Sequence, residues 1–181
     1  MPDVDPGRLL DGLLEQWPGY VAYVASYLYV AVIWLNHKAA FVRVHRLDHG
    51  LHVANLAVLF VTALLPFATA VASQALQRPD EFDRRVAVAF YALVGALLCA
   101  SWWGFFHYLG RHGDLVRGEV DDAYFQGERL RTAAGVLLYA VAGILGYFLD
   151  PLIALGVFVA LPLFYGATST GLYETRLVNR G

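Results

Sequence analysis

The chain has 181 residues, of which 59% are hydrophobic and 15% are charged, and its formal net charge is −2. A soluble domain carries about 25% charged residues, so this composition favours a bilayer over water as the solvent. The near-neutral charge gives no reason to expect a nucleic-acid partner. The single cysteine, Cys99, excludes an intrachain disulfide and a cysteine-rich metal site.

Apolar segments follow one another along the chain, and each reaches or approaches the roughly 20 residues that a membrane-spanning helix needs. There are five of them, at about 20–36, 53–75, 86–109, 133–149 and 151–167. Asp150-Pro151 separates the last two, since aspartate caps a new helix and proline suits its first turn. We therefore predict an all-α membrane bundle of five transmembrane helices, forming one domain over residues 1–181, with a tight hairpin at Asp150.

Residues 110–130 form the longest connection and carry charges of both signs. We interpret this stretch as a solvated loop or a surface helix, and we assign it no chemistry.

The basic residues outside the apolar segments divide unevenly between the two sides of the membrane. One side receives nine: Lys38, Arg43, Arg46, Arg111, Arg117, Arg129, Arg131, Arg176 and Arg180. The other receives Arg8, Arg78, Arg84 and Arg85. The positive-inside rule places the first set, and the C-terminus, in the cytoplasm and the N-terminus outside. Residues 1–17 lack the features of a signal peptide, so we expect either a helix upstream of this chain or direct translocation of a short acidic tail.

Two stretches are more distinctive than hydropathy alone. Residues 34–37 read Trp-Leu-Asn-His, and the next segment contains Asn-Leu at 55–56 and Leu-Leu-Pro-Phe-Ala-Thr at 64–69. These motifs resemble the second and third helices of the prokaryotic relatives of the lysosomal potassium channel called transmembrane protein 175.

The resemblance implies a potassium channel subunit of the bacterial plasma membrane that conducts K⁺ passively and needs no cofactor. It implies six helices with both termini in the cytoplasm, and tetramers whose first helices surround the pore. That first helix carries an Arg-x-x-x-Phe-Ser-Asp signature, which is not found in this sequence. We therefore expect this chain to lack the first helix, and we assign no pore-lining residue.

A polar group lies near the cytoplasmic end of the first segment and the start of the second. It consists of Trp34, Asn36, His37 and Asn55. Trp34 and His37 are three residues apart and share a helix face, whereas Asn36 lies on another face. The resemblance implies that this group braces the signature of the absent helix by hydrogen bonds. The alternative is an interfacial cluster that bonds to water.

Pro66 lies inside the second segment, where it removes one backbone hydrogen bond and predicts a kink. The kink is either structural or a gating hinge. Thr62 and Thr69 flank it, and we expect their hydroxyls to satisfy the freed backbone groups.

His45, His49 and His52 have helical spacing that suits a metal ion only if their segment is helical. The loop expected at Asp48–Gly50 and the lack of further ligands argue against a metal site. We interpret these residues as interfacial histidines facing anionic headgroups.

None of the five segments contains Asp, Glu, Lys or Arg. Proton-coupled transporters need ionisable groups in the membrane, and enzymes need a convergent set of reactive side chains. The lack of such groups argues against both classes and suits a pore. Together with the resemblance, it leads us to predict a non-enzymatic potassium channel subunit that works as an oligomer in the lipid bilayer. The alternative is a noncatalytic membrane scaffold or accessory subunit.

Overall fold

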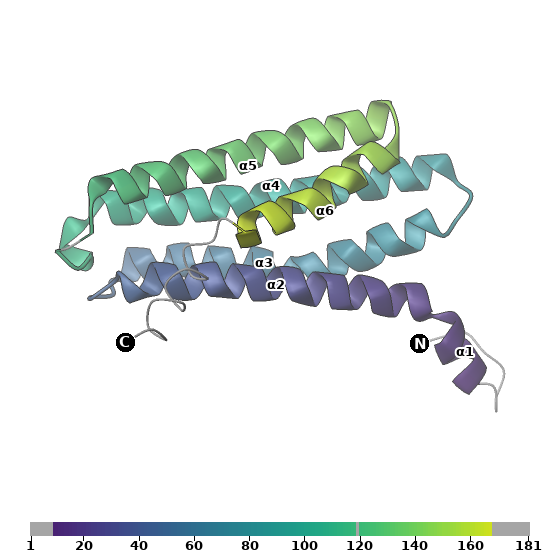
Figure 1. The fold of residues 1–181 in the computed structure, drawn as a ribbon, viewed down its shortest axis with the longest axis horizontal. Helices are drawn as coiled ribbons and strands as arrows, with labels where there is room; N and C mark the ends of the chain where they lie inside the picture. The colour runs from purple at the N-terminus through teal and green to yellow at the C-terminus, as the bar shows by residue number, and fades with distance from the viewer. Residues whose placement is uncertain (1–8, 119, 168–181) are drawn as a thin grey trace.

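The computed structural model describes residues 9–118 and 120–167, and every regular element within them is a helix (Figure 1). In chain order they are α1 (Leu9–Glu15), α2 (Trp17–Val42), α3 (His49–Leu76), α4 (Glu81–Arg111), the 3-10 helix η1 (Gly113–Leu115), α5 (Asp122–Phe148) and α6 (Pro151–Ala167). The all-α prediction is therefore confirmed. Arg8, Arg176 and Arg180, which enter the charge count above, lie outside the described residues.

Within the described residues, three helices are long and apolar enough to cross a membrane, namely α3, α4 and α5. A shorter apolar helix covers Pro151–Pro162. Helix α2 coincides with the first predicted segment but is not among the three. The count of five spans therefore stays a prediction.

The hairpin predicted at Asp150 is present. Helix α5 ends at Phe148 and α6 begins at Pro151. The Leu152 backbone N–H donates to the Asp150 carboxylate over 2.8 Å, so aspartate caps the new helix as the sequence predicts.

Helix α4 lies between α3 and α5, with α6 crossing beside it (Figure 1). Small residues allow these helices to approach closely. The ring of Tyr139, from α5, occupies the space where Gly95 of α4 would carry a side chain. Ala92 similarly meets Gly143, and Val88 meets Gly146. Close backbone approach of this kind is how helices pack tightly in lipid, where no hydrophobic force drives them together.

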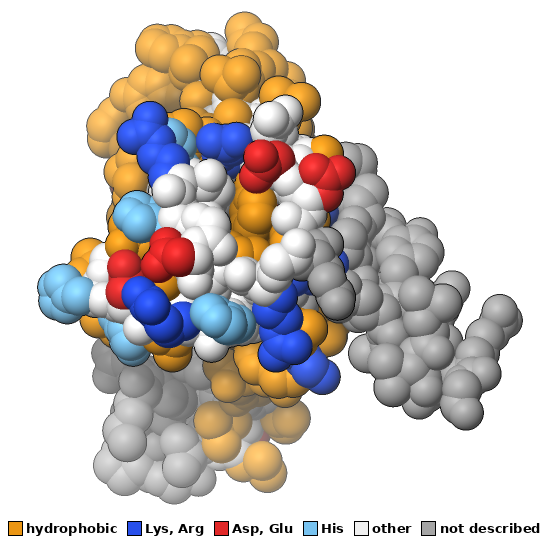
Figure 2. Space-filling model, turned by 90° about the vertical axis from the view of Figure 1, so that its left-hand side faces the viewer, with side chains coloured by type: hydrophobic (Ala, Val, Ile, Leu, Met, Phe, Trp, Pro, Cys, Tyr) orange, Lys and Arg blue, Asp and Glu red, His pale blue; other side chains and the backbone are white. Residues whose placement is uncertain are grey.

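Charged and histidine side chains gather at one end of the bundle (Figure 2). There the connection between α2 and α3 pairs with the chain after η1 in a single antiparallel bridge between Val44 and Val116. The Arg117 backbone N–H donates to the Arg43 carbonyl over 2.9 Å. The stretch 110–130 is therefore neither one loop nor one surface helix: it contains η1, this bridge and the first turns of α5.

The loop predicted at Asp48–Gly50 is wrong at its end, because α3 already begins at His49. Asp48 caps the helix by accepting a hydrogen bond from the Leu51 N–H over 2.8 Å. Gly50 lies in the first turn, and the Tyr108 ring fills the space that a side chain there would need.

Candidate functional site: the polar residues between α2 and its neighbours

The polar residues of α2 point in three directions. Asn36 and His37 are consecutive and lie on different faces, and Trp34, expected to share a face with His37, turns outward instead of joining it. His37 faces α3, Asn36 faces α5, and Trp34 faces away from the bundle. The four residues singled out in the sequence therefore do not form one network. The structure joins His37 to Asn55 and separates the other two from them.

His37 and Asn55 link α2 to α3. The His37 Nε2 atom donates to the Asn55 side-chain oxygen over 2.7 Å. Aromatic rings hold the imidazole in place, with the Phe41 ring stacked on it at 4.5 Å and Trp102 edge-on at 5.9 Å. Both side chains are half-buried, so each keeps partial access to solvent beside this hydrogen bond.

Asn36 takes part in a different bridge. Its side-chain oxygen accepts a hydrogen bond from the Arg131 guanidinium over 3.3 Å, and its amide donates to the Val32 carbonyl over 3.0 Å. Arg131 belongs to α5. Asn36 therefore connects α2 to the far side of the bundle.

Trp34 is 60% exposed, and the Lys38 ammonium lies 5.9 Å from the centre of its ring. Three tyrosines on the same helix, Tyr20, Tyr23 and Tyr27, are also exposed. We call these four residues the outward aromatic face of α2. Nothing among the described residues covers it.

Pro66 lies within one uninterrupted helix, α3. The carbonyl that a proline at this position leaves free is that of Thr62, four residues earlier. The hydroxyls of Thr62 and Thr69 donate instead to the carbonyls of Val58 and Leu65, over 2.7 and 2.8 Å. They therefore do not perform the repair expected from the sequence.

The loop end of α3 is fixed by a contact across the bundle. The Tyr108 hydroxyl donates to the second carboxylate oxygen of Asp48 over 2.6 Å. This hydrogen bond, with that from the Leu51 N–H, lowers the pKa of Asp48 below its usual value. Of the three loop histidines, His52 bonds the Asp48 carbonyl through Nδ1 over 2.7 Å, and no group of three metal ligands occurs among the described residues.

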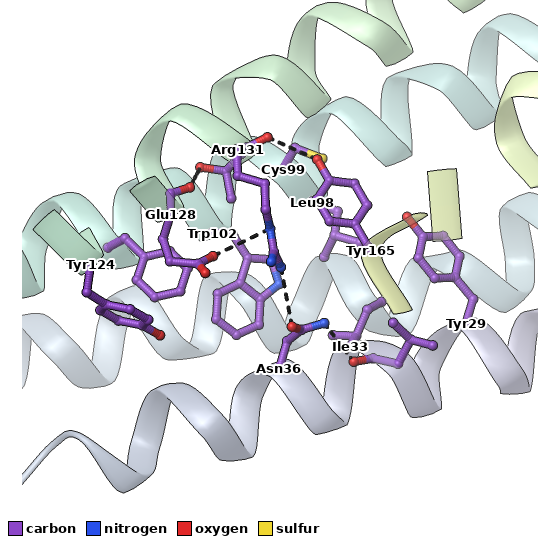
Figure 3. Close-up of a pocket in the computed structure, with 13 residues that line it drawn as sticks. Tyr29, Ile33, Asn36, Leu98, Cys99, Trp102, Tyr124, Glu128, Arg131 and Tyr165 are labelled. Atoms are coloured by element: carbon purple, nitrogen blue, oxygen red, sulfur yellow. Dashed lines mark hydrogen bonds and ion pairs between the residues drawn. The ribbon is translucent and has the colours of Figure 1, made fainter. Parts of the chain in front are cut away.

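A cavity lies between α2, α4, α5 and α6, and sequence reasoning missed it (Figure 3). Its polar side chains include Asn36, Glu128 and Arg131, and its apolar walls include Trp102 and Cys99. The Arg131 Nε lies 3.6 Å from a Glu128 carboxylate oxygen. The available signal was the i, i+3 spacing of Glu128 and Arg131 just before an apolar run. It does not reveal that Asn36, 95 residues away, meets Arg131.

Comparison with known proteins identifies the family of the chain. A family model described as "Endosomal/lysosomal potassium channel TMEM175" matches residues 1–66. A potassium channel of Streptomyces collinus is 35% identical over 167 residues, which are 92% of this chain and 80% of that protein. The chain belongs to the TMEM175 family.

Other TMEM175 relatives agree over nearly the same length. A potassium channel of Chamaesiphon minutus is 27% identical over 166 residues, covering 92% of this chain and 80% of that protein. The crystal structure of a lysosomal potassium-selective TMEM175 homolog from Chamaesiphon minutus has 26% sequence identity and a TM-score of 0.69, covering 90% of this chain and 79% of that one. These relatives and its apolar helices identify the chain as a multi-pass membrane protein. The resemblance drawn from residues 34–37, 55–56 and 64–69 is confirmed.

Proposed function

We propose that this chain is a subunit of a passive potassium channel in a bacterial plasma membrane, and that it is not an enzyme and uses no cofactor. The observation that carries the proposal is the 35% identity over 92% of the chain to a protein named as a potassium channel. The fold adds support, since the matching solved structure is of a channel described as potassium-selective.

The chemistry of the helices suits passive conduction. The apolar parts of the three long helices, 53–76, 86–110 and 133–148, contain no Asp, Glu, Lys or Arg. Coupled transport normally needs such groups inside the membrane, whereas a pore can be filtered by apolar constrictions and by hydroxyl or carbonyl dipoles. We therefore assign no coupling ion other than the K⁺ that flows.

The functional unit in this proposal is a homo-oligomer. The outward aromatic face of α2 supports it, because three tyrosine hydroxyls and an indole N–H in a row suit contact with protein or water better than with acyl chains. Assembly would bring the faces of neighbouring copies toward a shared axis. The pore-lining residues are not assigned.

His37 and Asn55 are proposed to hold α2 and α3 at the angle that the pore needs. Their 2.7 Å hydrogen bond is the direct polar link between these helices found in the described residues. Trp34 is proposed to contact a neighbouring element on the outward face, and Asn36 to act separately through Arg131. Pro66 is proposed to shape α3 beyond Asn55 along the chain.

The charged end shown in Figure 2 is proposed to face the cytoplasm. It carries Arg43, Arg46, Arg111 and Arg117, and cytoplasmic connections favour such residues. Labelling of single introduced cysteines at positions 46 and 78, in intact cells with a reagent that does not cross membranes, tests this: only position 78 should react. Reaction at position 46 alone would reverse the orientation.

The channel proposal is tested by K⁺ and Na⁺ efflux from proteoliposomes containing the purified chain. A second preparation, in which an added apolar helix carrying the Arg-x-x-x-Phe-Ser-Asp signature precedes the chain, is measured beside it. Potassium-selective efflux from either preparation supports the proposal. Folded protein with no efflux in both would overturn it and favour a membrane scaffold.

The role of the bridge is tested in whichever preparation conducts. We expect Asn55→Leu to reduce K⁺ efflux while leaving the amount of folded protein nearly unchanged. Thr62→Val is the matched control, because the Thr62 hydroxyl bonds only within its own helix. Equal effects of the two variants would show that the bridge has no particular role in conduction.

A further inference from the structure

The cavity in Figure 3 contains a carboxylate whose hydrogen-bonding capacity is not used. The Glu128 side chain is only 12% exposed, and its charge partner, the Arg131 Nε, lies 3.6 Å away, which is beyond hydrogen-bond distance. No donor within the described ranges bonds to its oxygens. A carboxylate has about four acceptor positions, so this one can accept further hydrogen bonds from a ligand.

Several other polar groups around the cavity already have partners. Asn36 bonds Arg131 and the Val32 carbonyl, and the Tyr165 hydroxyl donates to the Arg131 carbonyl over 3.0 Å. The Thr132 hydroxyl donates to the Glu128 carbonyl over 2.8 Å. A ligand would therefore find the Glu128 carboxylate as the strong acceptor of the cavity.

The charges of the cavity favour a neutral ligand. Glu128 and Arg131 carry opposite charges 3.6 Å apart, so the net charge of the pair is zero. A cation would be repelled by the guanidinium and an anion by the carboxylate, and either would have to give up its hydration. A hydroxyl group donates to a carboxylate without that cost, in a short charge-assisted hydrogen bond.

The remaining walls are apolar and set the size of the ligand. Leu98, Cys99, Trp102 and Phe106 line one side from α4, with Ile33 opposite. The cavity leaves about 50 Å³ for the centres of water-sized groups. At about 10–15 Å³ for each such group, this space takes about four non-hydrogen atoms, far less than the roughly 150 Å³ that admits benzene.

We propose that this cavity is a binding site for a short-chain alkanol, of about the size of propanol, whose hydroxyl donates to Glu128 and whose alkyl chain packs against Cys99 and Trp102. The site joins α2 to α5, since Asn36 and Arg131 meet at its edge. An occupant there therefore contacts the same helix that carries the outward aromatic face. The proposal concerns binding and does not depend on whether the chain conducts.

Binding is measured by saturation-transfer NMR with 1-propanol on the chain in lipid nanodiscs. Alkanol in the lipid gives the same background in all variants, so the difference between variants is the readout. Cys99→Met fills the cavity with a flexible side chain and should remove the protein-dependent signal. Glu128→Gln keeps the shape but loses the charge, and should weaken binding about fivefold. Glu81→Gln, at the exposed start of α4, is the matched control and should leave binding unchanged.

The size limit gives a second, independent readout. Cys99→Ala enlarges the cavity by the sulfur atom, so 1-butanol should bind this variant more strongly than it binds the wild type. Circular dichroism in the same nanodiscs confirms that each variant is folded. If the wild type and Cys99→Met give equal signals, or if chain-length dependence is the same in Cys99→Ala, the cavity holds water only and the proposal is wrong.

Discussion

The core formed by α3, α4 and α5 differs from helix α2 in how it is held. In the core, rings lie directly on glycines, as Tyr139 lies on Gly95, and the contacts are steric. Helix α2 also buries apolar residues, such as Ile33 and Ala40, but it is joined to its neighbours in addition by side-chain hydrogen bonds, from His37 to Asn55, Asn36 to Arg131 and Tyr29 to Tyr139. Steric packing fixes one arrangement, because interiors do not deform continuously. Helix α2 differs further in carrying the exposed outward aromatic face, so α2 is the element suited to contact partners.

The largest expected effect is in the core. Tyr139 is fully buried at 0% exposure, and its hydroxyl lies 2.6 Å from that of Tyr29. Tyr139→Ala should lower the free energy of unfolding by about 3–5 kcal/mol, as truncation of buried aromatic residues does. Denaturant-dependent unfolding in detergent measures it. Tyr139→Phe, which removes only the hydroxyl, should cost about 1 kcal/mol; equal losses in the two variants would contradict steric control of the core.

A smaller loss is expected where the core is tightest. An added methyl group in Gly95→Ala meets the Tyr139 ring, which must move. We expect a loss of about 1–3 kcal/mol, the usual cost of overpacking. The control is Gly104→Ala on the same helix, where a methyl group meets open space. If Gly104→Ala is as destabilising as Gly95→Ala, close approach is not what the glycine provides.

The polar attachment of α2 should be weaker still. A double-mutant cycle between His37→Phe and Asn55→Leu should give a coupling energy of about 0.6 kcal/mol, and at most about 1.7 kcal/mol, the range measured for interhelical hydrogen bonds in membranes. Unfolding of the wild type, both single variants and the double variant supplies the four values. A coupling energy larger than the loss of unfolding free energy in Gly95→Ala would reverse the contrast between the two regions.

The smallest effect concerns the loop end and depends on pH. The pKa of Asp48 is lowered in the folded state, mainly by the Tyr108 hydroxyl. Its contribution to stability is therefore present above the unfolded-state pKa of about 3.9 and is lost as the pH falls through the lower folded-state value. Tyr108→Phe should reduce this loss. Unfolding midpoints at pH 7 and pH 3 measure it, and an unchanged difference between the two pH values would show that the hydroxyl does not hold Asp48 ionised.

The sequence predicted the elements better than their side-chain partners. Helix positions and the hairpin at Asp150 follow from local signals, namely apolar runs, a capping aspartate and a proline at the first turn. The start of α3 was misplaced because Gly50 reads as a loop residue, whereas it is needed beneath the Tyr108 ring. That contact joins residues 58 positions apart, and no local pattern contains it.

The candidate site divides in the same way. Periodicity placed Asn36 on a different face from His37, but only the fold shows that this face meets Arg131. The mixed charges of the stretch 110–130 suggest contact with solvent and predict no chemistry there. In the structure Glu128, near the end of that stretch, is largely buried beside Arg131. The pairing of His37 with Asn55 is local enough, across one short loop, for the sequence to bring both residues forward.

The central claim is that this chain forms a potassium-selective pore, and the reversal potential across a planar bilayer tests it most directly. Purified protein is reconstituted with K⁺ on one side and an equal concentration of Na⁺ on the other. The account predicts a current that reverses far from zero, on the side expected when K⁺ is the permeant ion. A reversal potential at zero, or no current from either the chain alone or the chain with the added N-terminal helix when both are shown to be folded, would contradict it.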